Sequence, residues 1–236
     1  MIRCFLLFLF FALGAGAEDI ERPPGQLLYQ PMFIWMDSDV TQQGTGYLVE
    51  NAAGKVFGVT SIHFMYFEYG LFEAIWLDIP SSVPACGFRT SYGRPLTKEI
   101  AEFTDVKRDF ILLPAAEGCF DENTRLELDD RKRIESGEKL WFPNKDFESP
   151  EGHTWIEAEV SEDLGYLIEI KLDGMVVLES QSGSPFISQE TGKVVGMLTS
   201  AWEEDGRIWV NACPGRNVLR FLEKPREPVP LSISVQ

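Results

Sequence analysis

The sequence has only two histidines, His63 and His153, and only four cysteines in 236 residues. Basic residues are also scarce, since 21 Lys and Arg stand against 37 Asp and Glu, for a formal net charge of -16. An acidic chain repels nucleic-acid phosphates and anionic membrane surfaces, so we expect neither as a partner. Two histidines outside any His-Glu-x-x-His pattern also give little support for a zinc hydrolase.

Long hydrophobic runs are absent except at the start of the chain. Arg3 precedes the apolar residues 4–13, and Ala15-Gly16-Ala17 follows as a small-residue cleavage site. An uncleaved membrane anchor is the alternative, but a spanning helix needs about 20 apolar residues. We therefore expect residues 1–17 to be a signal peptide, and the mature protein, with a charge of -17 after the loss of Arg3, to be secreted or periplasmic and outside the membrane.

Three cysteines follow the expected cleavage site: Cys86, Cys119 and Cys213. Export permits a disulfide, but an odd number leaves one thiol over, and the sequence does not choose among the three possible pairs. So few cysteines exclude a disulfide-dense scaffold. The fold must therefore depend on a hydrophobic core.

Helical periodicity is nearly absent, and short apolar runs separated by turns take its place. Examples are residues 32–35, 46–49, 55–59 and 110–113. Such spacing predicts an all-β protein, either a barrel or a sandwich. One short helix is expected near the end, because Val218, Leu219, Phe221 and Leu222 fall on one helical face before Pro225. Residues 225–236 are predicted to be a tail.

The most charged stretch, residues 121–138, separates two strand-rich halves. We interpret it as a connection between two β domains, at 18–128 and 129–224; the alternative is a solvated strand face. The halves also resemble each other, because residues 46–58 and 184–196 each read as a strand, a turn ending in Gly-Lys, and a second strand.

A possible nucleophile lies in Ser180-Gln181-Ser182-Gly183-Ser184-Pro185, which precedes the apolar Phe186-Ile187. Ser, Gly and Pro are common turn residues, so a plain surface turn is the alternative. A reactive serine requires a base. Histidine is the natural base at neutral pH.

His63 ends the second strand of the first hairpin, whereas His153 lies in a loop-like context. Asp109 opens the apolar run 110–113, where it becomes partly buried and requires a partner such as an imidazole N–H. Asp105 is a nearby competitor without such a run. A structural histidine and a strand-capping aspartate are the alternatives.

These residues resemble the chymotrypsin/trypsin-like serine peptidase family, and especially its cysteine-poor bacterial members. The order His63, Asp109, Ser182 matches that family, and two further segments resemble its second barrel, residues 137–143 and 192–197. The resemblance implies two six-stranded antiparallel β-barrels with a short C-terminal helix, and a site between the barrels.

The resemblance also implies chemistry. Ser182 would attack a peptide carbonyl, His63 would transfer the proton, and Asp109 would orient the imidazole. The backbone N–H groups of Ser180 and Ser182 would bind the oxyanion. The substrate would be a peptide or protein, and no metal or other cofactor is implied.

The resemblance places side chains of the substrate pocket at Val176, Thr199 and Ser200. The apolar stretch Gly174-Met175-Val176-Val177 suggests an apolar pocket and hence an uncharged substrate side chain. Three residues depart from the family pattern: Ser180 replaces a glycine, Gln181 replaces a residue that is aspartate in trypsin but varies among bacterial relatives, and the bulky Ile62 precedes His63. They keep a catalytically inactive, peptidase-like binding module as the alternative function. Oligomeric state and the presence of a propeptide stay open.

Overall fold

The computed structural model describes residues 22–23, 28–35, 41–63, 72–78, 84–92, 104–114, 125–146, 148–149 and 152–223. The predicted signal peptide, the predicted tail and Cys119 lie outside these residues. None of the helices within the described ranges has both the length and the apolar character needed to cross a membrane.

The first half of the chain forms an antiparallel sheet of eight strands. They are β1 (Leu28–Trp35), β2 (Thr41–Gln43), β3 (Gly46–Glu50), β4 (Val56–Thr60), β5 (Phe72–Asp78), β6 (Pro84–Tyr92), β7 (Thr104–Asp105) and β8 (Phe110–Pro114). Their order is β6-β5-β1-β3-β4-β8-β7, and β2 pairs with β1. The described pairings leave this sheet open, so the first of the two predicted barrels is not confirmed.

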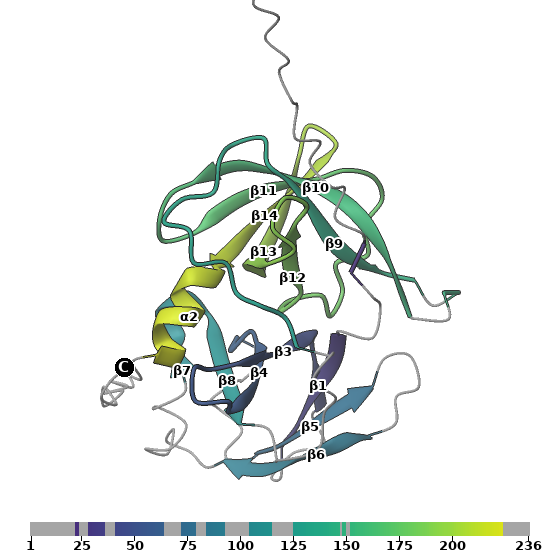
Figure 1. Ribbon diagram of the computed structural model, residues 1–236. Helices are drawn as coiled ribbons and strands as arrows, with labels where there is room; N and C mark the ends of the chain where they lie inside the picture. Colours follow the sequence, from purple (N-terminus) through teal and green to yellow (C-terminus); the bar gives the residue numbers. More distant parts are fainter. Residues whose placement is uncertain are drawn as a thin grey trace, which may run out of the picture.

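The second half forms a closed six-stranded barrel, as predicted (Figure 1). Its strands are β9 (Lys139–Lys145), β10 (His153–Asp163), β11 (Ile168–Leu172), β12 (Pro185–Ser188), β13 (Val194–Glu204) and β14 (Arg207–Pro214). In β11 the buried residues Ile168, Ile170 and Leu172 alternate with half-buried Glu169 and Lys171. This period of two is typical of a strand with one face toward a core.

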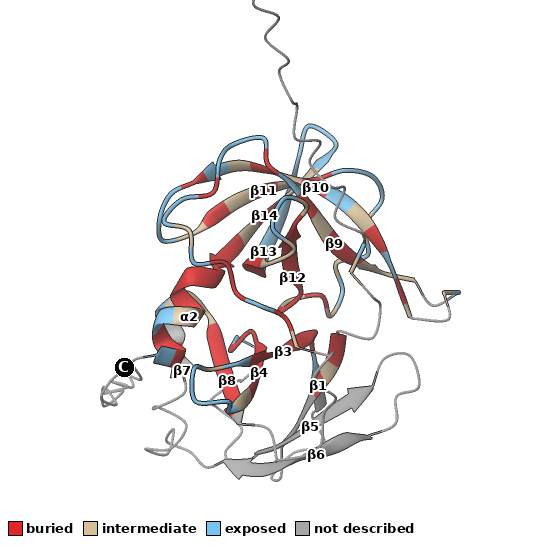
Figure 2. Ribbon diagram, viewed as in Figure 1, coloured by how far each residue is buried: buried red, intermediate tan, exposed pale blue. Residues whose placement is uncertain are grey.

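The described buried residues, red in Figure 2, include two hydrophobic clusters. One fills the barrel and includes Phe142 stacked on Phe186, with ring centroids 4.8 Å apart. The other joins the first sheet, the barrel and helix α2 (Gly215–Glu223). Phe221 of the helix meets Phe110 of β8 edge to face at 5.4 Å. The predicted helix is therefore confirmed, and it packs across the two halves.

Residues 125–138 connect the halves and are tied to both of them. The Leu126 N–H donates to the Leu48 carbonyl of β3 at 2.8 Å, and the Asp129 N–H donates to the Val194 carbonyl of β13 at 2.9 Å. The connection thus crosses from the sheet to the barrel while its backbone stays hydrogen-bonded.

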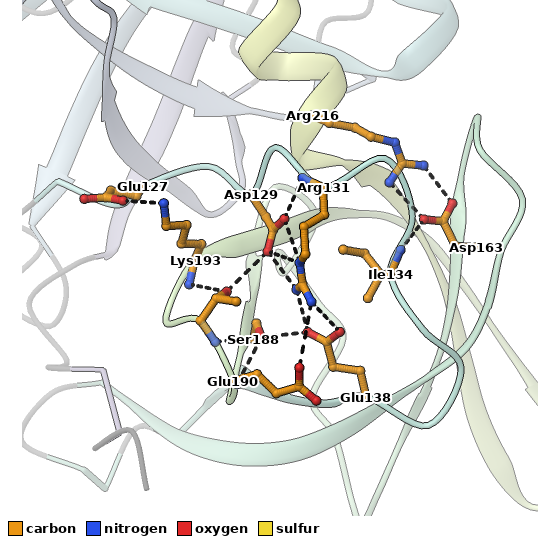
Figure 3. A network of polar contacts seen from close by, with 11 residues as sticks. Glu127, Asp129, Arg131, Ile134, Glu138, Asp163, Ser188, Glu190, Lys193 and Arg216 are labelled. Carbon is orange, nitrogen blue, oxygen red and sulfur yellow. Dashed lines mark hydrogen bonds and ion pairs between the residues drawn. The ribbon is translucent and has the colours of Figure 1, made fainter. Parts of the chain in front are cut away.

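Two acids of this connection, Asp129 and Glu138, are buried inside the fold, which the sequence did not predict. Figure 3 shows Arg131 between Asp129 and Glu138. The guanidinium makes two hydrogen bonds to Glu138, at 2.7 and 3.0 Å, and the side chains of both acids are almost fully buried. Burial alone would raise the pKa of Asp129, but the hydrogen bonds from Arg131 outweigh it and hold that pKa below its ordinary value.

A second buried ion pair joins the barrel to the helix. Arg216 donates to both carboxylate oxygens of Asp163, at 2.7 and 2.9 Å, and both side chains are at most 5% exposed. The Asp163 carboxylate also accepts the N–H of Ile134, at 2.9 Å. Burial opposes its ionisation, yet these bonds keep the pKa of Asp163 below its ordinary value. The ion pair fixes the start of α2 against the barrel.

Candidate active site

His63 and Asp109 lie together at the ends of neighbouring strands. His63 follows β4 and Asp109 precedes β8, which pairs with β4. Nδ1 of His63 lies 2.6 Å from Oδ2 of Asp109, and the His63 backbone N–H donates to Oδ1 at 2.9 Å. An ionised carboxylate only accepts hydrogen bonds, so this contact places the imidazole proton on Nδ1. Nε2 then carries the lone pair that a general base requires.

Asp109 adopts a left-handed backbone conformation, with φ 57, after the 3-10 turn η2 (Val106–Arg108). Aspartate tolerates this region better than most residues. The competitor Asp105 instead accepts hydrogen bonds from the backbone and the guanidinium of Arg108. Of the two aspartates, Asp109 is thus the one whose carboxylate contacts the His63 ring.

The bulky Ile62 fits beside this pair. It is 2% exposed, and its N–H donates to the Asp109 carbonyl at 3.4 Å. The side chain of His63 remains 43% exposed and that of Asp109 23% exposed. The imidazole is therefore accessible from solvent while its backbone is held on the buried side.

Ser182 lies on the loop that leads into β12, and the loop bends sharply on both sides of it. Ser180 has φ 57 and Gly183 has φ 91, which are both left-handed conformations. Such a conformation costs a residue with a side chain about 1–2 kcal/mol, and glycine almost nothing. Ser180 therefore adopts a backbone conformation that suits glycine, which is the usual residue at this position in the family that the sequence resembles.

Gly183 brings this loop against the strand that leads to His63. A Cβ atom at Gly183 would lie 2.0 Å from the Thr45 carbonyl oxygen, 2.6 Å from Thr60 Oγ1 and 3.2 Å from the Ser61 nitrogen. Only a glycine fits such a close approach. Ser182 and His63 are one and two residues from these contacts, so the loop and the histidine segment pack against each other.

Two buried residues that the sequence analysis missed shape this loop. Gln181, 2% exposed, donates from Nε2 to the Pro143 carbonyl at 2.9 Å and accepts from Ser184 Oγ at 2.8 Å. Thr45, also 2% exposed, donates from its N–H to the Ser182 carbonyl at 3.0 Å. Thr45 lies more than 130 residues from the loop, and no local pattern announces such a contact.

The two amides expected to bind an oxyanion, the N–H groups of Ser180 and Ser182, make no hydrogen bond to a backbone carbonyl of the described residues. The intervening Gln181 N–H does donate, to the Leu178 carbonyl at 3.1 Å. Two uncommitted donors flanking a committed one are suited to binding a developing negative charge.

The three predicted pocket residues occupy the stretches before and after the loop. Val176 is half-buried against the barrel core. Thr199 donates from its hydroxyl to the Asn211 carbonyl at 3.1 Å, and Ser200 Oγ accepts from the Asn211 amide at 3.1 Å. Met175, beside Val176, is 93% exposed. The segment before the nucleophile loop thus exposes apolar side chains to solvent.

Other reactive groups of the described residues are arranged differently. His153 is the first residue of β10, buried, and packs edge to face on Trp155 at 5.4 Å. It is thus part of a strand rather than of the loop that its sequence suggested. Cys213 is a free, buried thiol, so the two disulfide pairings that would include it are wrong, and burial raises its pKa above the ordinary range.

A cavity of about 460 Å³ lies between the end of β3, residues 125–128 and Leu219. None of the candidate site residues lines it. Within the described ranges, no group of three or more His, Cys, Asp or Glu side chains is placed to hold a metal ion.

No protein-family model matches the sequence, and no curated protein matches it. Solved structures do resemble the fold. The protease Rv3671c from M. tuberculosis has a TM-score of 0.53 and 13% identity, with 86% of this chain and 82% of that chain covered. Deg5 has a TM-score of 0.53 and 18% identity, with coverage of 84% and 88%. A mutant of the tobacco etch virus protease has a TM-score of 0.56 and 13% identity, with coverage of 88% and 82%.

These likenesses span most of each chain, so they concern both halves and not the barrel alone. At such low identity they establish the fold and leave the chemistry to the residues of the site. The chain therefore has the trypsin/chymotrypsin-like fold.

Proposed function

We propose that this protein is an exported serine endopeptidase that hydrolyses peptide bonds. The observation that carries the proposal is the 2.6 Å contact between Asp109 Oδ2 and His63 Nδ1, beside the loop of Ser182. This contact supports a general base in the required tautomer, and the packing of Gly183 against Thr45 and Thr60 supports the approach of the Ser182 loop to it. The protease neighbours support the same reaction class.

In the proposed mechanism, the Ser182 hydroxyl attacks the scissile carbonyl while His63 Nε2 accepts its proton. His63 then donates that proton to the leaving amine, and the acyl group remains on Ser182. A water molecule, activated by the same imidazole, hydrolyses the ester and restores the serine. Asp109 stabilises the imidazolium in both steps, and the N–H groups of Ser180 and Ser182 stabilise the oxyanion.

The assignment of a serine nucleophile rests on the residues of this chain and not on the structurally similar proteases. Position 182 carries a hydroxyl, and the described free thiol, Cys213, is buried with a raised pKa. A buried, protonated thiol is a poor nucleophile. Ser182 is therefore the group that we assign to the attack.

The substrate is proposed to be a peptide or protein with an uncharged side chain before the cleaved bond. Half-buried Val176 and the hydroxyls of Thr199 and Ser200 supply no charge in the proposed pocket. A cleavage-site profile of peptide products tests this point. A strict preference for Arg or Lys would contradict it.

The function is tested by incubating the purified mature protein with a diverse peptide library and identifying the products by mass spectrometry. We expect cleavage that Ser182→Ala abolishes and that the matched control Ser136→Ala, at an exposed serine, leaves intact. A folded but inert wild type would instead favour a peptidase-like binding module, the alternative that Ser180 in place of glycine supports. Saturable binding of a peptide without turnover would then identify that function.

Export is a separate part of the proposal and rests on residues 1–17. We expect the protein released from cells to begin at Glu18, which N-terminal sequencing tests. Retention of the apolar segment in the mature protein would contradict it.

A further inference from the structure

One residue of the first sheet contacts three consecutive residues of the nucleophile loop. The Thr45 N–H donates to the Ser182 carbonyl at 3.0 Å, and its hydroxyl donates to the Ser180 carbonyl at 3.0 Å. The same hydroxyl lies 3.4 Å from Gln181 Oε1. The hydroxyl has one proton to donate, and the contact with the Ser180 carbonyl is the shorter of the two, so we assign the hydrogen bond to Ser180.

Thr45 is anchored from the other side as well. Its carbonyl accepts the Thr60 hydroxyl at 2.8 Å, and Thr60 is fully buried. Thr60 lies three residues before His63 in the same segment. A continuous chain of hydrogen bonds therefore runs from the segment of the base through the buried Thr60 and Thr45 to the loop of the nucleophile.

Ser180 is the strained member of this chain. It has φ 57, a conformation that a serine rarely adopts and a glycine adopts freely. Relaxation of Ser180 toward negative φ would reorient its N–H, one of the two amides assigned to the oxyanion. It would also break the bond from Thr45 to the Ser180 carbonyl, so that bond opposes the relaxation.

We propose that Thr45 is a positioning residue, whose hydroxyl holds Ser180 in the left-handed conformation and keeps the Ser180 N–H available to the substrate oxygen. This inference rests on the proposed peptidase function and deepens it. In this inference the Thr45 hydroxyl compensates for the backbone strain of Ser180. A glycine at position 180 would need no such support. Thr45 itself touches no reacting atom.

The test compares Thr45→Val with Thr45→Ser in the purified mature protein. Valine keeps the shape of threonine but removes the donor, whereas serine keeps the donor. We expect Thr45→Val to lower kcat about tenfold, as for a lost hydrogen bond that aligns an oxyanion donor, with KM nearly unchanged. We expect Thr45→Ser to retain kcat within about twofold of the wild type.

The decisive arm adds Ser180→Gly, because glycine holds positive φ without help. We expect Ser180→Gly to restore the kcat of the Thr45→Val protein to within about threefold of Ser180→Gly alone. A general packing defect at Thr45 would not be rescued by a change at the other end of the bond. Repeating the cycle with Thr45→Ala makes the test independent of whether the valine methyl group fits.

Wild-type kcat in Thr45→Val, or no rescue by Ser180→Gly in either cycle, would overturn the role of Thr45 and leave the proposed function standing. An inert wild type that a fluorophosphonate does not label would overturn the proposed function, and this inference with it. Circular dichroism and melting temperature confirm that each compared variant is folded.

Discussion

The two halves of the molecule contribute to the candidate site in different ways. The first sheet supplies His63 and Asp109, held together by a carboxylate that binds both the ring and the backbone of the histidine. The barrel supplies a loop whose shape depends on close packing at Gly183 and on neutral hydrogen bonds at Gln181 and Ser184. One half of the site thus depends on charge and the other on backbone shape. The two halves should therefore be sensitive to different kinds of substitution.

The largest expected effect comes from removing the charge of the first half. Asp109→Asn should lower kcat about 10⁴-fold, because an amide no longer favours the imidazole tautomer with its proton on Nδ1. Folding should be little affected, since the amide keeps the shape. The measurement is kcat on a cleaved peptide.

Asp105→Asn is the matched control, because the Asp105 carboxylate accepts its hydrogen bonds from Arg108. It should keep kcat within about tenfold of the wild type. Equal losses at both positions would show that the first half does not act through the carboxylate of Asp109.

The next effect concerns the barrel that carries the loop. Arg216→Met leaves the Asp163 carboxylate buried without its partner, which typically costs about 3–5 kcal/mol in the free energy of unfolding. Denaturant unfolding measures this loss. Lys139→Met is the control, because it removes a Lys139–Glu159 pair that is exposed, and its effect should be much smaller. Similar losses in both variants would mean that the buried pair does not hold the barrel.

The shape of the loop is tested by Gly183→Ala. Its Cβ would lie 2.0 Å from a backbone oxygen, at a positive φ, so we expect a loss of about 2–4 kcal/mol in stability together with loss of peptide cleavage. Gly174→Ala separates the steric clash from the strain of a positive φ, because Gly174 has φ 98 but nothing within 4 Å of the added carbon. It should lose only about 1–2 kcal/mol. An active, stable Gly183→Ala protein would contradict the close approach of the two halves.

The smallest expected effect is a dependence of stability on acid pH. The pKa values of Asp129 and Asp163 are lowered by their hydrogen bonds, although burial opposes this. Their contribution is therefore complete above the unfolded pKa of about 3.9 and is lost as the pH falls through the lower folded values. The free energy of unfolding should be flat above about pH 5 and decrease below about pH 4, with a shallower slope in Asp163→Asn. An unchanged slope in that variant would exclude Asp163 from the effect.

Local patterns were enough to predict much of this fold. The hairpins at residues 46–58 and 184–196 lie in the strand pairs β3–β4 and β12–β13, and the terminal helix buries Val218, Phe221 and Leu222. Alternating apolar residues and helical spacing are properties of a few consecutive residues. They are therefore visible without tertiary structure.

What the sequence did not predict depends on contacts across the chain. Thr45 and Gln181 appear as ordinary polar residues until a loop more than 130 positions from Thr45 folds against it. The charged stretch predicts a connection or a solvated strand face, yet its buried acids Glu138 and Asp129 accept hydrogen bonds from Ser188 and Thr191 of the barrel half. Buried polar networks have no sequence period, and only the assembled fold reveals them.

The central claim is that the first half activates a hydroxyl of the second. The most direct measurement is to treat the folded protein with a fluorophosphonate and locate the adduct by peptide mass spectrometry. The account predicts phosphonylation of Ser182, lost in His63→Ala. Either of two results would contradict it: Ser182 that stays unmodified in the folded protein, or Ser182 that is still modified in His63→Ala.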